Sequence, residues 1–433
     1  MEERNRGRKT NHSIMSKRRG RIWGKSMADT IITRAKRRNR LRIRGSRGVI
    51  KTTAAATKAA AVEKRNQSSW LIDRLPPEVL LIGILSTLPV KSLLQLRFVC
   101  KSLYHIISDT YFVKTHLNRP ITSPNLLRQR QHIFIRSSRK PDIPYAISLE
   151  AAADKVDGDI VASGVKMDYL VEFKEHSFDY CYILGSCNGL LCLGLGPTAL
   201  YIFNLSTRES KTIPVPDYLN SQNLYIFGFG YDHSADDYKL VAADKKGFYV
   251  YSLRTDSWKK VQGLPNNHSN ISSSDETLLN GTLLNGTLLN GAIHWLCLGQ
   301  IIAFSLADEK FWEFPAPTLS NNDIPQTLRL LGGCLCMVPM FGREFWVMKE
   351  YGVAQSWTKV VIEVPFSKTI KTLALLENHE AILRIGFEKL VLYNTRERTY
   401  RDLVLRDFPD VARIRNTGAY VESLVSPCHG NLS

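Results

Sequence analysis

Two patterns of apolar residues divide the chain. Up to Leu117, apolar residues recur at helical spacing, and one predicted helical face carries Leu81, Ile84, Leu85 and Leu88. After Asn118 the pattern changes to short alternating apolar runs separated by turn residues, and it keeps this character to the C-terminus. The sequence therefore predicts a small helical segment followed by a long region of β-strands.

The helical segment has its own start and stop signals. Pro76 and Pro77 suit the start of a helix, since a first-turn proline loses no intrahelical hydrogen bond, and Pro89 ends that helix. A second helical run follows, with one face made of Leu93, Leu96, Cys100, Leu103 and Ile107, and with Leu94 and Phe98 on another face. Because apolar side chains point in more than one direction, the segment needs a second surface, either elsewhere in the chain or on a partner.

Five similar hairpins recur in the β-rich region. They begin at Leu200, Gly247, Ile301, Glu344 and Lys389. Equivalent positions in successive hairpins (Phe203, Tyr251, Phe304, Val347 and Leu392) are 48, 53, 43 and 45 residues apart. A repeat of this length, with four short strands per unit, is typical of propeller blades. We therefore expect a mainly β protein with a small α-helical N-terminal domain and a β-propeller-like domain; a β-sandwich is the alternative.

An aromatic residue usually opens the second strand of these hairpins. The four residues are Trp258, Trp312, Trp357 and Tyr400. Since the faces of propeller strands pack between blades, we expect the three tryptophans to be structural rather than exposed anchors. Partner contacts are then expected in the connecting loops, of which 265–276 and 316–326 are the longest irregular ones.

The net charge of +18 is concentrated in the N-terminal tail. Residues 1–65 hold 21 of the 58 Lys and Arg but 4 of the 40 Asp and Glu, which leaves 37 basic and 36 acidic residues in the remainder. Few apolar residues and a block of like charge predict a disordered tail. We interpret this tail as a nuclear-import or nucleic-acid patch, as a transit peptide, or as an extension without a function. The near-neutral remainder argues against a nucleic-acid-binding fold.

The sequence contains no convincing catalytic or metal motif. The eight cysteines form no CxxC pair and no zinc-type spacing with histidine, so we expect reduced, buried thiols and neither a metal nor a cofactor. Asp232, Asp236 and Asp237 are interpreted as a solvated turn, and His294 with Trp295 as a core pair. No secretory signal follows Met1, and no apolar run is long enough to span a membrane.

The helical segment resembles the F-box of the large plant family. The resemblance is carried by LPPEVL at Leu75, LPVKSLL at Leu88 and VCKS at Val99, although Tyr104 stands where the family usually has Trp. It implies a three-helix hook that binds a Skp-type adaptor, and through it a cullin and a RING subunit. The implied contact residues are Leu75, Pro76, Ile84, Leu85, Leu88, Pro89, Leu93, Leu96, Val99, Cys100 and Tyr104.

The region from Ser186 to Pro427 resembles the plant F-box-associated domain. GSCNGLLCL at Gly185, GFGYDHSADDYKLV at Gly228, LNGAIHWL at Leu289 and YVESLVSP at Tyr420 are similar to its landmark segments. Thr277–Gly291 is a triple repeat of TLLNG, and only its last copy fits the pattern. We expect the extra copies to extend a surface loop, because loops accept insertions at little cost.

Together these features predict three parts: a basic tail (1–69), an F-box (70–118) and an F-box-associated β-propeller-like domain (119–433). The resemblance implies a non-enzymatic adaptor of an SCF ubiquitin ligase in the nucleus and/or cytoplasm, which recruits a protein substrate of unknown identity. The alternatives are an interaction scaffold outside a ligase and a nucleic-acid-associated protein acting through the tail.

Overall fold

The computed structural model describes part of the chain. The described residues are 82–119, 126, 129–137, 144–148, 155–156, 159–167, 181–195, 199–216, 226–244, 246–262, 284–297, 299–317, 326–339, 341–376, 378–406, 408, 411 and 414–428. The basic tail, Leu75 and Pro76 lie outside this set. No helix within these ranges is both long and apolar enough to cross a membrane.

The helical segment folds as short helices. Residues 82–85 are helical, the chain turns at 86–88, and Pro89 is the N-cap of α4 (Val90–Leu96). The first helix therefore ends before Pro89, as predicted, but it ends already at Leu85. The predicted second helical run is wrong as a single helix. Extended backbone at Cys100 (φ −156°, ψ 162°) separates α4 from α5 (Lys101–Ser108).

The break allows the two halves of that run to share one core. In a continuous helix, Leu93 and Ile107 would be about 21 Å apart along the axis. As two helices, both residues are buried in the same apolar cluster. A third helix, α6 (Thr110–Asn118), begins at Asp109, whose carboxylate accepts hydrogen bonds from the backbone N–H groups of Tyr111 and Phe112.

Four of the five sheets contain a simple antiparallel meander. They are built from β5 (Cys181–Cys187), β6 (Leu190–Leu195), β7 (Ala199–Asn204) and β8 (Glu209–Ile213); from β9 (Ile226–Asp232), β10 (Asp237–Asp244), β11 (Gly247–Ser252) and β12 (Ser257–Lys260); from β14 (Thr287–Leu289), β15 (Ala292–Cys297), β16 (Gln300–Ser305) and β17 (Phe311–Pro315); and from β18 (Gln326–Leu331), β19 (Cys334–Pro339), β20 (Glu344–Met348) and β21 (Trp357–Val361). A short 3₁₀ helix, η7 (Ala354–Ser356), precedes β21.

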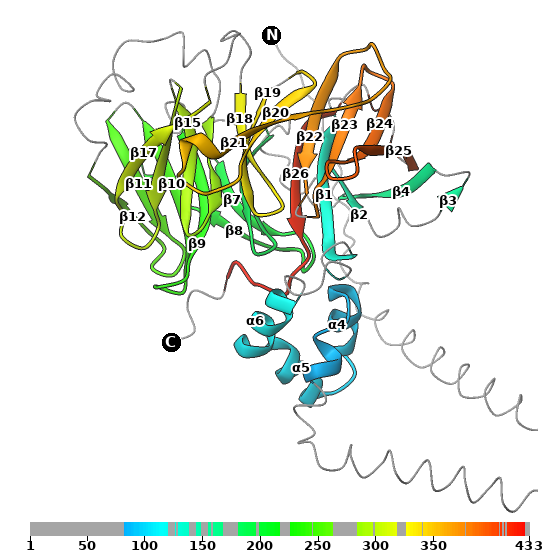
Figure 1. The fold of residues 1–433 in the computed structure, drawn as a ribbon. Coiled ribbons are helices and arrows are strands. Elements are labelled where there is room, and N and C mark those ends of the chain that lie inside the picture. Colours follow the sequence, from blue (N-terminus) through cyan, green and yellow to red (C-terminus); the bar gives the residue numbers. More distant parts are fainter. Residues whose placement is uncertain are drawn as a thin grey trace, which may run out of the picture. The chain divides into compact units, whose positions relative to one another are not determined.

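The fifth sheet joins two four-stranded units side by side (Figure 1). One unit is β22 (Ile370–Leu375), β23 (Glu380–Ile385), β24 (Lys389–Asn394) and β25 (Thr399–Arg406); the other is β4 (Asp159–Lys166), β2 (Tyr145–Ser148), β1 (Gln131–Ser137) and β26 (Ile414–Val421), with β3 (Lys155–Val156) paired to β4. The outer strands β25 and β4 pair in parallel. The described strands thus form six four-stranded units.

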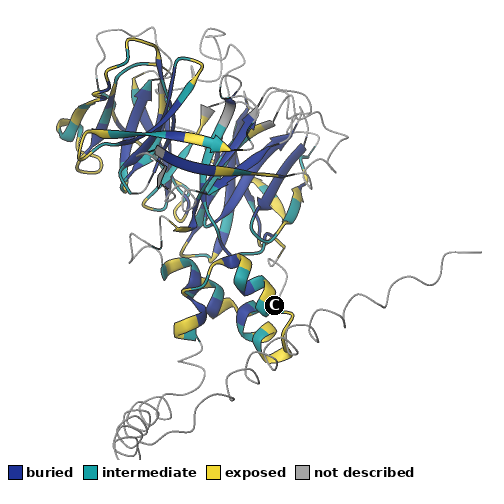
Figure 2. Ribbon diagram, turned by 90° about the vertical axis from the view of Figure 1, so that its right-hand side faces the viewer, coloured by how far each residue is buried: buried dark blue, intermediate teal, exposed yellow. Residues whose placement is uncertain are grey.

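The six units close into a ring, which confirms the propeller and removes the sandwich alternative. The innermost strands contact one another in circular order, and the circle is β26, β5, β9, β14, β18, β22 and back to β26. Closure comes from the antiparallel pairing of β26 with β1, so the two ends of the β region share one unit. The strands are mainly buried, as the dark blue in Figure 2 shows.

The five predicted hairpins are the third and fourth strands of five units. Their aromatic residues connect neighbouring units. Trp258 donates from Nε1 to the carbonyl of Pro214, which directly follows the last strand of the preceding unit, β8. Trp357 donates from Nε1 to the carbonyl of Pro315, the last residue of the preceding unit's last strand, β17. Tyr400 packs edge-on against Phe366 in the corresponding place. Trp312 packs edge-on against His294 of its own unit but is 37% exposed, so the expectation of a structural rather than exposed residue is met only in part there.

The duplicated TLLNG segment is more than a loop extension. The third copy forms β14 and its turn, as predicted, but the second copy forms β13 (Leu284–Asn285), which pairs in parallel with β9. Gly286 N donates to the carbonyl of Phe227 at 2.6 Å. The inner edge of β9 has unpaired backbone groups, and these offer the inserted copy a partner. The first copy lies outside the described residues.

Candidate partner-binding surface

The helices pack around one apolar core, to which a residue near the C-terminus also contributes. Its buried members are Leu85, Val90, Leu93, Ile107, Phe112 and Leu424. Two of the predicted contact residues, Leu85 and Leu93, therefore hold the helices together, and Leu88 and Leu96 are partly buried against the same core.

Large apolar side chains also lie on the outside of the helices. Phe98 (91% exposed) and Val99 (68%) stand in the turn between α4 and α5, and Tyr104 (52%) follows within α5. Ile84 (56%) is exposed on the first helical turn. Since these side chains are left over after the core is filled, they are the candidate surface for a partner.

The eleven predicted contact residues thus divide by position. Ile84, Pro89, Val99, Cys100 and Tyr104 are exposed; Leu88 and Leu96 are partly buried; Leu85 and Leu93 are buried; Leu75 and Pro76 lie outside the described residues. Phe98 and Tyr111 are also strongly exposed but are not in the predicted set. For Phe98 a signal was present, because it lies off the apolar face that carries Leu93.

Arg130, the residue before β1, donates hydrogen bonds to backbone carbonyls of the helical segment. Its guanidinium donates to the carbonyls of Ser86 (2.8 Å), Leu88 (3.2 Å) and His116 (2.6 Å). Ser86 and Leu88 follow the last residue of the first helical turn, where carbonyls lack partners within the helix. Burial lowers the pKa of Arg130 to about 10, so the side chain stays charged at neutral pH.

His116 completes this junction as a neutral side chain. Its Nε2 lies 2.9 Å from the carbonyl of Leu88, so this nitrogen carries the proton and donates. Burial, reinforced by the positive charge of Arg130, lowers the pKa of His116 to about 4.

Glu422 approaches the helices from the other end of the chain. Its carboxylate accepts a hydrogen bond from the backbone N–H of Val90, the first residue of α4, and lies 3.7 Å from Nε2 of His132. Burial by itself raises the pKa of Glu422, but the bond to His132, the Val90 N–H and the charge of Arg130 outweigh it and hold the pKa below its ordinary value. The carboxylate is therefore ionised at neutral pH.

The residues that follow Glu422 are held by the first meander. Ser423 Oγ donates to the carbonyl of Asn188, and Asn204 Nδ2 donates to the carbonyls of Ser423 and Val425. Gly189, with φ +82°, is required here because a Cβ at this position would overlap Ser423.

The aspartates between β9 and β10 make structural bonds. Asp236 pairs with Lys114 of α6 at 2.8 Å, which adds a further contact between the helices and the propeller. Asp232 and Asp237 are buried, so the interpretation as a solvated turn is wrong for them. Burial raises the pKa of Asp232, but hydrogen bonds from Lys239 and Ser234 lower it to about 2. Within the described ranges, no group of His, Cys, Asp and Glu could hold a metal ion.

His294 and Trp295 form the predicted core pair. They are 0% and 3% exposed. His294 Nδ1 lies 3.1 Å from the carbonyl of Thr287, which can only accept, so Nδ1 carries the proton and Nε2 accepts from the hydroxyl of Tyr351 at 2.6 Å. Burial lowers the pKa of His294 to about 4.

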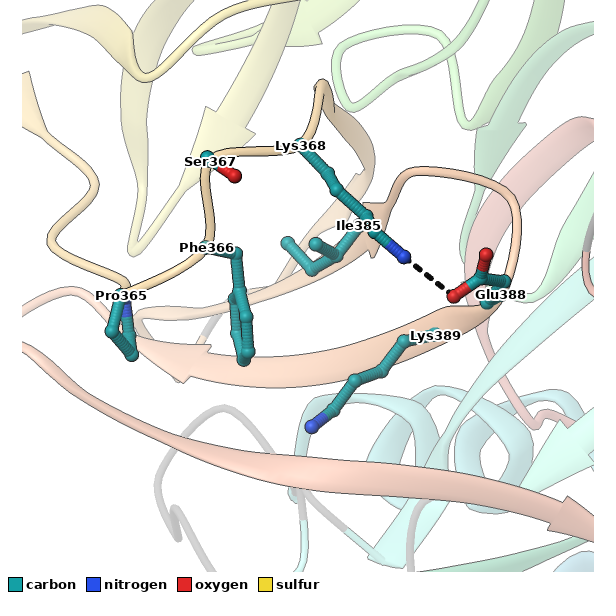
Figure 3. Close-up of a pocket in the computed structure, with 7 residues that line it drawn as sticks. All are labelled: Pro365, Phe366, Ser367, Lys368, Ile385, Glu388 and Lys389. Carbon is teal, nitrogen blue, oxygen red and sulfur yellow. Dashed lines mark hydrogen bonds and ion pairs between the residues drawn. The ribbon is translucent and has the colours of Figure 1, made fainter.

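An open pocket of about 290 Å³ lies between the β21–β22 connection and the β23–β24 turn (Figure 3). Its lining residues are Pro365, Phe366, Ser367, Lys368, Ile385, Glu388 and Lys389. Lys368 pairs with Glu388 at 2.6 Å, and Lys389 pairs with Asp402 at 2.6 Å and lies over the ring of Phe366. Both lysine ammonium groups at this pocket are therefore paired with carboxylates.

The described cysteines are free thiols in different settings. Cys187, Cys192, Cys297 and Cys336 are buried, as expected, whereas Cys100 and Cys428 are exposed, against expectation. Burial raises the pKa of Cys187 to about 12 and that of Cys297 to about 11, which keeps these thiols protonated and unreactive.

Comparisons with known proteins match both parts of the chain. Residues 148–426 match a family model described as F-box associated beta propeller domain, and residues 72–119 match one described as F-box-like. The F-box protein CPR1 of Arabidopsis thaliana is 27% identical, with 80% of this chain and 87% of the relative covered. The F-box/kelch-repeat protein At3g23880 of the same plant is 27% identical, with 79% and 93% covered.

Among solved structures, a streptogramin B lyase is 14% identical over 65% of this chain and 85% of that chain, with a TM-score of 0.38. A likeness at this score supports no conclusion about either fold or activity.

Proposed function

Since the chain belongs to the family of F-box proteins with an F-box associated beta propeller domain, we propose that it is the substrate-recognition subunit of an SCF-type ubiquitin ligase. In this proposal the helices bind a Skp-type adaptor, which brings the cullin and RING subunits, and the propeller binds the protein to be ubiquitinated. The chain itself performs no catalysis. We place this activity in the nucleus and/or cytoplasm.

The observation that carries the proposal is the exposed apolar surface of Ile84, Phe98, Val99 and Tyr104. It lies on a helical unit whose core is already filled. A partner that covers these four side chains would remove them from water, and protein interfaces have such apolar anchors at their centre.

We further propose that the substrate binds where the second and third strands of each unit connect. The helices contact the other end of the strands. Lys114 of α6 reaches the β9–β10 turn at Asp236. The segment after β26, whose Leu424 packs into the helical core, reaches the β5–β6 turn through the bond from Ser423 to Asn188. In an antiparallel meander, the turn between the second and third strands lies at the opposite end. Glu388 and Lys389, at the pocket of Figure 3, belong to such a turn region, so the pocket is available to substrate.

The test is binding of the full chain to a purified Skp-type adaptor, measured by calorimetry. Phe98→Asp and Val99→Asp place a charge within the proposed interface and should abolish binding. Phe387→Asp is the matched control, because Phe387 is also strongly exposed (68%) but lies in the β23–β24 turn of the propeller. Leu88→Asp should also abolish binding, but through the helical core that Leu88 packs against.

Failure of the wild-type chain to bind the adaptor, or equal binding by Phe98→Asp and Phe387→Asp, would refute the proposal. Adaptor binding without recruitment of cullin would instead favour the scaffold alternative.

A further inference from the structure

We infer that Glu422 and Leu424, at the far end of the chain, are positioning residues for adaptor binding: they complete the helical unit that presents the exposed apolar surface. This inference rests on the proposed function and adds that adaptor binding by the helices depends on the propeller. The adaptor-binding unit would be complete only when the propeller ring is closed.

The first reason is that the core of the helices is incomplete without Leu424. Five buried members of that core, Leu85 to Phe112, come from the helical segment itself, and the sixth is Leu424, which is 3% exposed. A leucine removed from such a cluster leaves a cavity that the neighbouring side chains fill only in part. The helices would then lose packing within this core.

The second reason is that α4 has no cap of its own. The residue before it is Pro89, whose side chain makes no capping hydrogen bond. α6, by contrast, is capped locally by Asp109. At α4, the carboxylate of Glu422 accepts from the N–H of Val90, the first residue of the helix. A negative charge also suits the positive end of the helix dipole.

The third reason is that ring closure places this segment. Glu422 follows directly on β26, whose last residue pairs with Gln131, and Glu422 N donates to the carbonyl of Arg130 at 2.8 Å. Ser423 and Val425 are then held by Asn188 and Asn204 of the first meander. The position of Leu424 is therefore set by the propeller and not by the helices.

The decisive experiment measures adaptor affinity of full-length variants by calorimetry with a purified Skp-type adaptor. Leu424→Ala should weaken binding about tenfold or more, because a smaller fraction of the chain presents a formed α4–α5 surface. Leu424→Met keeps an apolar side chain of similar volume and should restore affinity to within about twofold of wild type.

Leu335→Ala is the matched control, since Leu335 is equally buried but belongs to a different cluster in the β14–β17 and β18–β21 units. It removes the same atoms from the propeller and should leave adaptor affinity unchanged. Loss of affinity equal to that of Leu424→Ala would show a general stability effect and overturn the inference.

Amide hydrogen exchange on the free chain gives a readout that needs no adaptor. In Leu424→Ala, the amides of α4 and α5 should exchange faster, while those of β9 to β11 keep their protection. If the strands lose protection too, amide exchange in α4 is compared between Glu422→Ala and Glu422→Gln. Gln keeps an acceptor for the Val90 N–H, and Ala does not. Faster α4 exchange in Glu422→Ala alone supports the inference.

The failures are distinguishable. A wild-type chain that does not bind the adaptor contradicts the proposed function, yet exchange in α4 still tests the coupling. Wild-type affinity and unchanged α4–α5 exchange in Leu424→Ala would overturn the coupling and leave the proposed function intact.

Discussion

The carboxylate of Glu422 lies 3.1 Å from the backbone nitrogen of Val90, which is 332 residues earlier in the chain. Arg130 reaches the same helices from the start of β1, and β1 and β26 are the two strands that close the propeller. The strand pair β1–β26 therefore closes the propeller and also supports the helices. The two residues that reach the helices are Arg130, directly before β1, and Glu422, directly after β26.

Arg130 is the most strongly bonded side chain of this junction. Arg130→Met should destabilise the chain by about 3 kcal/mol, because it leaves buried carbonyls of Ser86, Leu88 and His116 without donors. The free energy of unfolding of Arg130→Lys should lie between those of the wild type and Arg130→Met, since a single ammonium lacks the planar guanidinium group that reaches several carbonyls. Urea unfolding followed by circular dichroism measures both.

The control for Arg130 is Arg396→Met at an exposed turn, which should change the free energy of unfolding by at most about 0.5 kcal/mol. Equal stability of the two Met variants would show that the carbonyl contacts contribute nothing.

His294 should make stability depend on pH in a defined window. Its folded pKa of about 4 lies below the ordinary value of 6.5, so between these values the unfolded chain binds more protons than the folded one. Stability from this group is therefore complete above about pH 6.5 and falls as the pH drops toward 4, with about 2 kcal/mol lost by pH 5.

The measurement for His294 is thermal melting at pH 7.5 and pH 5.0. His294→Gln cannot titrate, and its melting temperature should fall less between the two pH values than that of the wild type. His116, whose pKa is also about 4, contributes a similar fall in both proteins, so the comparison isolates His294. Parallel falls in the two proteins would contradict the assignment.

Much of the propeller could be predicted because each of five units contains a local hairpin. The markers Phe203 to Leu392 repeat at similar spacing, and all lie in the third strand of a unit. The sixth unit gave no such repeat, since its inner strand β26 and its neighbour β1 come from opposite ends of the domain. Pairing between strands so far apart in the sequence cannot be predicted from the apolar pattern of a short stretch.

The candidate surface was predicted less completely, for a related reason. Helical periodicity shows that Leu85 and Leu88 share a face, but it does not show what covers that face. Part of the cover is Leu424, which is more than 300 residues away and is brought there by β26. The predicted contact set therefore includes Leu85 and Leu93, which the chain buries itself, and does not include the strongly exposed Phe98.

Trp258 and Trp312 occupy equivalent hairpin positions but should differ in their effect on stability. Trp258 is partly buried against the core of the first two meanders and donates to Pro214, so Trp258→Ala should cost about 2–3 kcal/mol, below the value for a fully buried tryptophan. Trp312 is 37% exposed, and Trp312→Ala should cost about 1 kcal/mol. Chemical unfolding of the two variants tests the order. A larger loss at Trp312 would contradict the role given to the Trp258–Pro214 contact.

The TLLNG repeat allows a test in which two deletions differ by five residues. Because the three copies are identical, deletion of any one copy gives the same chain, which keeps a copy for β13 and a copy for β14. Its melting temperature should match the parent. Deletion of two copies brings Glu276 to the position now held by Gly286, where a Cβ would overlap Ile293.

The two-copy deletion should therefore lose β13, the bond from Gly286 N to Phe227, and the bond from Asn285 Nδ2 to the carbonyl of Ile183. A fall of several degrees in melting temperature is expected, together with faster amide exchange in β9. The one-copy deletion is the matched control, since it also shortens the connection after β12. If both deletions melt like the parent, β13 contributes nothing and the extra copies act only as loop; if both fall equally, the first copy has a structural role of its own.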